Sequence, residues 1–329
     1  MTKTLKAVSR HSDSDQHLRR VVEMSVSKLE EHVYLIDTEA AGIKNFIASY
    51  VLKGERVAMV ETGPTSSVPN LLAGLKQLKV KPEDVAYVAV SHIHLDHAGG
   101  VGALLEHLPK AKVIVHPRGA PHLAHPEKLW EQSRMVLGSI TELYGEPEPV
   151  PEDRMLAAAD GTIFDVGNGV SLRVVETLGH ASHHQSYYEL PSQGIFTGDA
   201  AGIYLGGVDV VVPTTPAPFR LDAALASLDK LLSLKPVNLF YSHFGKAPDP
   251  AGKLQTYAQQ LKLWATIAKQ GLDNGESFES ISKRIFERDK AVREALEYVK
   301  VHPILSDTVL THSVQGVVDF VQKYGLASR

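Results

Sequence analysis

The sequence contains no cysteine among its 329 residues, and this absence removes several kinds of site at once. Disulfides, thiol nucleophiles, iron–sulfur clusters and cysteine-bound zinc are all excluded. Any transition-metal site must therefore be built from histidine and carboxylate ligands. The chain is well supplied with the first of these, because it contains 16 histidines.

Long apolar runs and an excess of basic charge are also missing. No apolar run approaches the roughly 20 residues that a membrane span needs, and residues 1–20 lack the apolar core of a signal peptide. The net charge of −4 offers no basic surface to nucleic acid. We therefore expect a cytoplasmic protein that binds neither membranes nor nucleic acid.

The order of predicted elements divides the chain into three parts. Residues 1–22 form a polar N-terminal extension, residues 23–249 alternate short strands with helices, and residues 250–329 show helical periodicity alone. Inside the second part, residues 117–160 carry several prolines around one helical stretch, Glu127 to Tyr144, which is typical of an insertion or lid. This pattern predicts an α/β sandwich with a C-terminal helical domain.

The most informative segment is Ser-His-Ile-His-Leu-Asp-His at residues 91–97, which follows a short buried strand. If the chain is still extended at His92 and His94, their side chains point the same way. The turn then presents Asp96 and His97 from another direction. One turn can therefore offer two pairs of ligands to two neighbouring metal ions, and imidazole with carboxylate suits zinc, iron, manganese or cobalt.

Three further candidate ligands, His180, Asp199 and His243, each lie directly after a predicted strand. Loops at strand ends commonly carry function on a rigid scaffold. The repeated context predicts that these residues join the segment 91–97 in one metal site.

The order of these residues resembles the metallo-β-lactamase fold superfamily of hydrolases, over roughly residues 30–245. The motif His-x-His-x-Asp-His is followed by Gly-His, Thr-Gly-Asp and a late histidine, and Val-Glu-Thr-Gly precedes it. The resemblance implies an α/β fold of the four-layer αββα sandwich type, with a C-terminal helical extension beyond it. It is nearest to glyoxalase II-like thioesterases and to lactonases.

The resemblance also implies a role for each residue. Seven side chains would bind two divalent metal ions: His92, His94 and His180 one ion, Asp96, His97 and His243 the other, and Asp199 both. Glu61 and His184 would orient these ligands without binding metal. Zinc is the expected metal, with iron or manganese as alternatives. His183 is assigned to packing or to a supporting position behind the ligands, and His302 is assigned to packing or to the surface.

Two departures narrow the branch of the family. His94 replaces the glutamate of flavodiiron-type members, which disfavours redox di-iron chemistry. Asp199 replaces the cysteine of the most familiar antibiotic-degrading β-lactamases. The glutathione-contacting residues of glyoxalase II-like enzymes are not found after Asp199, so lactones and simple esters stand level with glutathione thioesters as substrates.

The implied reaction is attack of a metal-bridging hydroxide on the carbonyl of a small-molecule ester, lactone or thioester. Asp96 would orient the nucleophile or move its proton. Tyr204 is the candidate donor to the oxyanion and a candidate substrate-binding residue, and Phe219 is the candidate apolar wall of the cleft; either could instead be a packing residue. The helix around Trp130 could cap the cleft, pack internally or pair with a second subunit in a homodimer.

Three other interpretations stay open. A phosphodiesterase-type hydrolase would use the same two-metal clamp and would need basic residues near the cleft, for which Arg220 and Lys246 are the close candidates. A mononuclear iron sulfur dioxygenase of the same fold would use fewer ligands. A non-catalytic scaffold would be expected to lose ligands, and all seven are present in this sequence.

Overall fold

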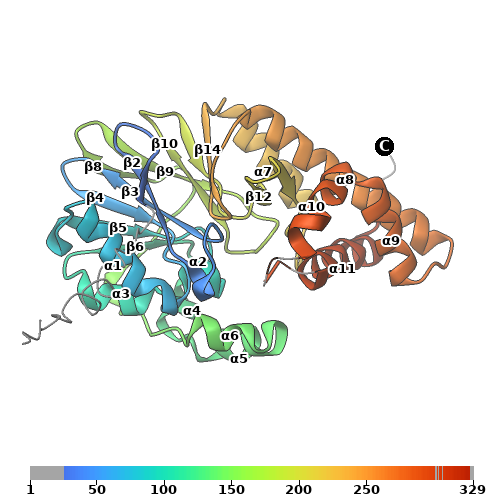
Figure 1. Cartoon of the computed structure of the whole chain (residues 1–329), viewed down its shortest axis with the longest axis horizontal. Coiled ribbons are helices and arrows are strands. Elements are labelled where there is room, and N and C mark those ends of the chain that lie inside the picture. The colour runs from blue at the N-terminus through green and yellow to red at the C-terminus, as the bar shows by residue number, and fades with distance from the viewer. Residues whose placement is uncertain (1–25, 301, 303, 306, 327–329) are drawn as a thin grey trace, which may run out of the picture.

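The computed structural model describes residues 26–300, 302, 304–305 and 307–326 (Figure 1). The predicted N-terminal extension, residues 1–22, lies outside the described residues. Two large β-sheets, one β-hairpin and flanking helices make up the described part of the chain.

The first sheet has seven strands that stand in the order of the sequence. They are β1 (Val26–Lys28), β2 (Val33–Asp37), β3 (Ala48–Lys53), β4 (Val57–Val60), β5 (Val85–Ala89), β6 (Lys112–Val115) and β7 (Met155–Ala157). Strands β1 to β4 pair antiparallel, whereas β4 to β7 pair parallel. Because parallel strands end at the same edge of a sheet, the segments that follow β4 to β7 gather there.

The second sheet has six strands in the order β15-β14-β11-β10-β9-β8. They are β8 (Ile163–Gly167), β9 (Val170–Glu176), β10 (Gln185–Glu189), β11 (Gly194–Phe196), β14 (Asn238–Tyr241) and β15 (Gly245–Ala247). The two sheets pack face to face. Tyr50 of β3 lies between them, with its ring 5.0 Å from that of Phe196 and 5.6 Å from that of Phe240. This apolar layer is the centre of the sandwich.

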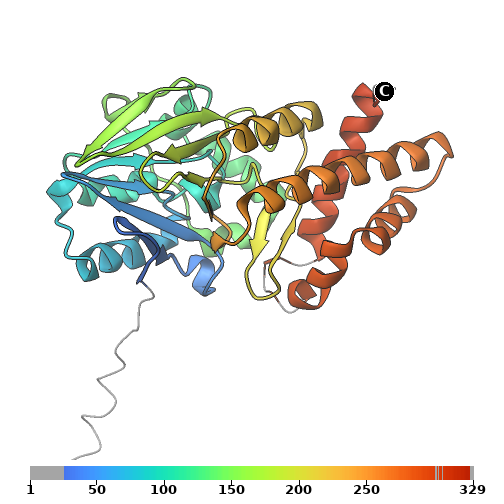
Figure 2. The ribbon, with the colours of Figure 1, turned by 90° about the horizontal axis from the view of Figure 1, so that it is seen from above.

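Helices cover the outer faces of both sheets. Over the first sheet, Gly74 of α1 (Val68–Gln77) lies against Ile36 of β2, so closely that a Cβ would come within 2.7 Å of its side chain. Over the second sheet, Leu228 and Leu231 of α7 (Leu221–Ser233) are buried in one cluster with Ile195 of β11. The predicted four-layer αββα sandwich is confirmed, and Figure 2 shows the two sheets packed together within it.

Residues 117–160 contain three short α-helices, one 3-10 helix (η4, Glu152–Arg154) and one strand. The α-helices are α4 (Ala120–Ala124), α5 (Glu127–Leu137) and α6 (Ile140–Tyr144). The sequence predicts a single helix from Glu127 to Tyr144, but Gly138 adopts a left-handed φ of 56° that interrupts it. Strand β7 extends the first sheet, so the end of this segment belongs to the sheet, whereas α5 and α6 project from the body (Figure 1).

Among the described residues no strand follows β15, and the chain continues as helices. These are α8 (Pro250–Asp273), α9 (Phe278–Arg288), α10 (Lys290–Lys300) and α11 (Asp307–Tyr324). They pack beside the hairpin of β12 (Ile203–Leu205) and β13 (Val210–Val212), which the sequence analysis did not predict. Within the described part of the chain, no helix is both long enough and apolar enough to cross a membrane.

Candidate metal centre

The seven predicted ligands meet at the edge of the sandwich where several strands end. Each follows a strand directly: residues 92–97 follow β5, His180 follows β9, Asp199 follows β11 and His243 follows β14. The rigid sheets therefore hold loops that are far apart in sequence against one another.

The segment 91–97 changes direction at His94. This residue has the extended angles φ −59° and ψ 150°, and its carbonyl accepts hydrogen bonds from the N–H groups of His97 and Ala98 at 3.0 and 2.9 Å. The short helix α2 (Leu95–Ala98) begins there. His92 and His94 consequently precede the turn, while Asp96 and His97 lie within it.

The first three imidazoles converge through their ring nitrogens. His94 Nδ1 lies 2.8 Å from His92 Nε2 and 3.1 Å from His180 Nε2. His180 Nδ1 donates to the carbonyl of Thr214 at 2.9 Å, which leaves its Nε2 with a free lone pair. Burial lowers the pKa of His92, and it lowers that of His94 to about 3. Neutral imidazoles that converge in this way can each offer a ring nitrogen to a single cation.

The second group contains Asp96, His97 and His243. The Oδ2 atom of Asp96 lies 3.8 Å from His97 Nε2 and 3.5 Å from His243 Nε2. Asp199 stands between the two groups, because its Oδ1 lies 3.3 Å from His97 Nε2 and its Oδ2 lies 3.5 Å from His180 Nε2. One carboxylate can therefore offer an oxygen to each group.

Charge is unevenly distributed across the centre. Burial disfavours the charged form of His97, but the carboxylates of Asp199, Asp96 and Glu61 outweigh this and hold its pKa well above the ordinary value. Burial likewise disfavours ionised Asp199, yet the neighbouring His97 and His180 hold the pKa of that carboxyl low. The His97 side of the centre thus concentrates negative charge that a cation would neutralise.

Several buried polar atoms of the centre have no hydrogen-bond partner among the described residues. They are Glu61 Oε2, His97 Nδ1 and Nε2, Asp199 Oδ1 and His243 Nδ1. Buried polar groups are nearly always satisfied in folded proteins. Nitrogen and oxygen donors of His92, His94 and His180, and of Asp96, His97 and His243, also lie within 4.8 Å of one another in each group. These residues fit a pair of divalent ions bound side by side.

Comparison with known proteins identifies the family. A family model described as the metallo-beta-lactamase superfamily matches residues 43–243. The chain belongs to this superfamily. The match confirms the family that the sequence motifs predicted. Members of this superfamily are metal-dependent hydrolases.

The relatives include proteins named for several different activities. The metallo-beta-lactamase fold-containing protein ST1585 of Sulfurisphaera tokodaii is 34% identical over 201 residues, which is 60% of this chain and 72% of that protein. Its crystal structure superposes with a TM-score of 0.60 at 28% identity, covering 71% of this chain and 87% of that one. The N-acyl homoserine lactonase AttM of Azorhizobium caulinodans is 33% identical over 40% of this chain and 46% of its own length. The hydroxyacylglutathione hydrolase of Aeromonas salmonicida is 26% identical over 73% and 79%.

Glu61 lies behind the metallo-beta-lactamase centre, where the sequence analysis places an orienting residue. It follows β4 with a left-handed φ of 67°, which is uncommon for a residue with a side chain. Its Oε1 accepts a hydrogen bond from Ser242 Oγ at 3.1 Å and lies 3.6 Å from His97 Nδ1. The carboxylate is therefore placed to fix the orientation of the His97 ring.

His184 supports the backbone of the Thr-Gly-Asp motif. Its Nε2 accepts the N–H of Asp199 at 3.0 Å, while its Nδ1 contacts Thr177 Oγ1 at 2.9 Å. Both ring nitrogens of His184 thus contact groups other than the ligand imidazoles. A Cβ at Gly198 would come within 2.5 Å of His184 Nε2 and of Ser91 Cβ, so this close approach requires glycine.

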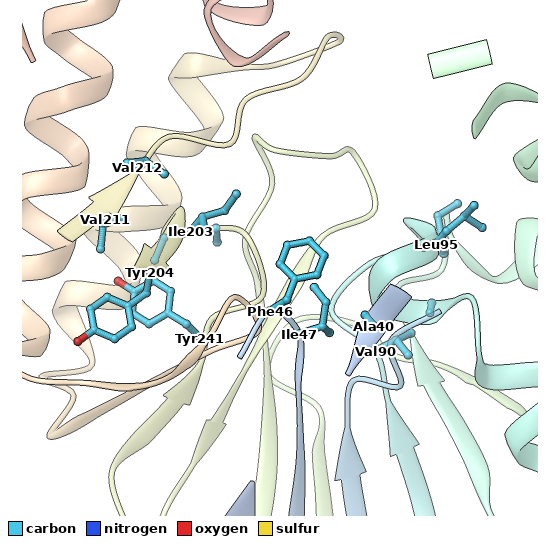
Figure 3. Close-up of a cluster of buried hydrophobic side chains, with 14 of the residues drawn as sticks. Ala40, Phe46, Ile47, Val90, Leu95, Ile203, Tyr204, Val211, Val212 and Tyr241 are labelled. Carbon is cyan, nitrogen blue, oxygen red and sulfur yellow. The ribbon is translucent and has the colours of Figure 1, made fainter. Parts of the chain in front are cut away.

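Tyr204 lies on β12 beside the centre, but its hydroxyl is already engaged. It donates to Asp209 Oδ1 at 2.9 Å, and burial together with that carboxylate raises the pKa of Tyr204 to about 12. Its ring lies 5.4 Å from that of Tyr241, and Figure 3 shows the hydroxyl pointing away from Phe46. Phe219 is 3% exposed and packs within the helical side of the core. The substrate roles of both residues stay predictions.

A cavity of about 430 Å³ opens beside His243. The residues lining it include Phe46, Tyr204, Tyr298 and His302. The sequence gives no sign that Phe46 and Tyr298 belong to the site, and His302 was predicted to pack or lie at the surface, because no motif joins positions so far apart in the chain. Only the fold brings the end of α10 to the metallo-beta-lactamase centre.

Proposed function

We propose that this protein is a dinuclear metal-dependent hydrolase that cleaves a carboxylic ester, lactone or thioester. The observation that carries the proposal is the position of Asp199, whose Oδ1 approaches His97 and whose Oδ2 approaches His180, members of two different groups of ligand atoms. A site for one ion would need only one of these groups.

The distances between the side chains support a proposed assignment of ligands. His92, His94 and His180 would hold one ion with Asp199 Oδ2, and Asp96, His97 and His243 would hold the other with Asp199 Oδ1. When bound, divalent ions supply Lewis acidity, which polarises a carbonyl and lowers the pKa of water to about 7. We propose zinc, which suits imidazole and carboxylate ligands.

The chain's own residues would orient the reactants. The Asp96 side chain is 22% exposed, whereas that of Asp199 is 4% exposed. Asp96 is therefore the carboxylate of the centre that incoming water can reach, and it would accept the proton of the attacking water. Glu61 and His184 would hold the ligands in place, because their contacts fix the His97 ring and the Asp199 backbone.

The substrate class is supported by the relatives and by the cavity. AttM carries the name of a lactonase and the Aeromonas salmonicida relative that of a hydroxyacylglutathione hydrolase, so the carboxylic ester and thioester classes both occur among them. The described residues that line the cavity beside His243 include no lysine or arginine. A phosphodiester would lack the basic partners it favours.

A substrate panel tests the proposal. Metal-reconstituted protein would be assayed with acyl-homoserine and simple lactones, glutathione thioesters, p-nitrophenyl esters and phosphodiesters. We expect hydrolysis of at least one carboxylic ester, lactone or thioester at rates well above those of phosphodiesters. Turnover restricted to phosphodiesters, or oxygen consumption with one iron per chain, would overturn it.

A further inference from the structure

The cavity beside His243 is built by three parts of the chain that are distant in sequence. Phe46 comes from the loop before β3, Tyr204 from the β12–β13 hairpin, and Tyr298, His302 and Leu305 from the end of α10 and the connection to α11. The last contribution gives the C-terminal helical region a direct place beside the proposed metal centre.

Phe46 links the two histidines of the cavity. Its ring centroid lies 5.3 Å from that of His243 and 5.0 Å from that of His302. Figure 3 shows Phe46 between the hairpin residues Ile203 and Tyr204 on one side and Leu95 on the other. His302 is therefore one aromatic ring away from a proposed metal ligand.

The hydrogen bonds of His302 define its tautomer. Its Nδ1 accepts the backbone N–H groups of Ile304 and Leu305 at 3.3 and 3.0 Å. A nitrogen that accepts these bonds carries no proton, so in the neutral ring the proton is on Nε2. Burial lowers the pKa of His302, which favours this neutral form. His302 is thus a hydrogen-bond donor through Nε2.

The lining is uncharged. Among the described residues that line the cavity, none is aspartate, glutamate, lysine or arginine, and most side chains are aromatic or aliphatic. Moving an ion into such surroundings costs free energy, because no oppositely charged side chain in the lining compensates for the lost hydration. The volume of about 430 Å³ lies within the range of small-molecule pockets, roughly 300 to 1,000 Å³.

We infer that this cavity binds the non-reacting portion of an uncharged ester, lactone or thioester, and that His302 Nε2 donates a hydrogen bond to an oxygen on that portion. The inference rests on the proposed hydrolase function and narrows its substrate class. The favoured substrate carries a short apolar chain with an amide, keto or hydroxyl oxygen. His302 would act as a positioning residue that sets affinity and does not touch the reacting atoms.

Three p-nitrophenyl esters separate the contribution of apolar contact from that of the His302 hydrogen bond. They are the acetate, the hexanoate and the 4-acetamidobutanoate, and only the last carries an amide oxygen. For metal-loaded His302→Phe, which keeps a ring against Phe46, we expect kcat/KM for the acetamido ester to fall roughly 5- to 10-fold, chiefly through KM. The loss should be smaller for the acetate and the hexanoate, because neither carries the amide oxygen that accepts the hydrogen bond. His302→Gln, which retains an N–H donor, should recover part of the loss.

Two variants of α10 test the apolar lining. Tyr298→Ala should raise KM for both longer esters by a larger factor than KM for the acetate, because it removes a wall of the cavity that the longer chains would contact. Leu296→Ala is the matched control, since Leu296 lies on the same helix but lines a different groove, together with Phe278 and Phe286. Equal effects of the two substitutions, or equal loss of all three esters in His302→Phe, would overturn the inference.

Binding of N-butylacetamide to the metal-loaded protein gives a readout independent of turnover, measured by saturation-transfer NMR. We expect the wild type to bind this amide and His302→Phe to bind it at least 5-fold more weakly, consistent with loss of one hydrogen bond. Absence of wild-type binding would overturn the inference even if the esters are hydrolysed. Binding with no hydrolysis of any ester would instead count against the proposed function.

Discussion

At the scale of single residues, the centre has a neutral half and an anionic half. His92, His94 and His180 are kept neutral by burial, whereas His97 is surrounded by carboxylates. The spacing of residues 91–97 predicted which of these side chains share a turn, because backbone geometry fixes direction over so few residues. Sequence alone could not give the charge balance, since Glu61 reaches His97 only through the fold.

Loss of the Glu61 charge should weaken metal binding by the Asp96, His97 and His243 group more than metal binding by the other group. In Glu61→Gln, the affinity for the more weakly held ion should fall roughly 10- to 100-fold, because the substitution removes the negative charge beside His97 Nδ1. Chelator competition with zinc measures this. Glu189→Gln is the control, because Glu189 is equally buried and contacts a histidine, His32, away from the centre. Equal losses in both variants would contradict the orienting role.

The metal-free protein should lose stability as the pH falls. Burial lowers the pKa of His183 to about 4, below its unfolded value near 6.5. The stability it contributes is present above pH 6.5 and is lost as the pH falls toward 4, because the unfolded state binds the extra proton. Urea unfolding at pH 7 and pH 5 should show a loss on the order of 1 kcal/mol from this residue. His183→Asn should show a shallower pH dependence, and an unchanged slope would refute the assignment.

At the scale of elements, the β12–β13 hairpin is tied to α8. Lys253 Nζ donates to Asp209 Oδ1 at 2.8 Å, and the same carboxylate accepts the Tyr204 hydroxyl. The hairpin was not predicted from the sequence, because each strand has only three residues, too few to show a clear alternation of apolar and polar side chains. The single helix predicted over residues 127–144 failed for a different reason, since a glycine within an apolar periodicity does not reveal its φ in advance.

Substitutions at Tyr204 distinguish an oxyanion donor from a hairpin anchor. If Tyr204 donates to the oxyanion, Tyr204→Phe should lower kcat about 100-fold and Asp209→Asn should not. We expect the other pattern, in which both variants lower Tm by a few degrees with kcat within about 3-fold, because the hydroxyl already donates to Asp209. Thermal melts and kcat of the two purified variants decide between these roles.

At the scale of the whole molecule, the C-terminal helices are integral to the body. Trp264 of α8 is fully buried, and Thr215 Oγ1 donates to the carbonyl of Ser313 on α11 at 2.6 Å. The sequence predicted the boundary near residue 250 from the end of the strand pattern. It could not predict that α10 and its connection to α11 line the cavity, because that contact is set by packing across the chain.

Thermal unfolding should therefore be a single cooperative transition. The helices share one apolar cluster with the outer face of the second sheet, so neither part can unfold without exposing the other. Calorimetry of the metal-loaded protein should give one peak. Two resolved peaks would show that residues 250–329 form an independent domain.

The central claim is that Asp199 joins two metal ions in a hydrolytic centre. Elemental analysis of zinc-reconstituted wild type and Asp199→Ala, prepared side by side, tests it most directly. We predict two zinc ions per chain in the wild type and loss of most of the bound metal, with the hydrolase activity, in the variant. Full metal content and activity in Asp199→Ala, or a single tightly held iron in the wild type, would contradict the account.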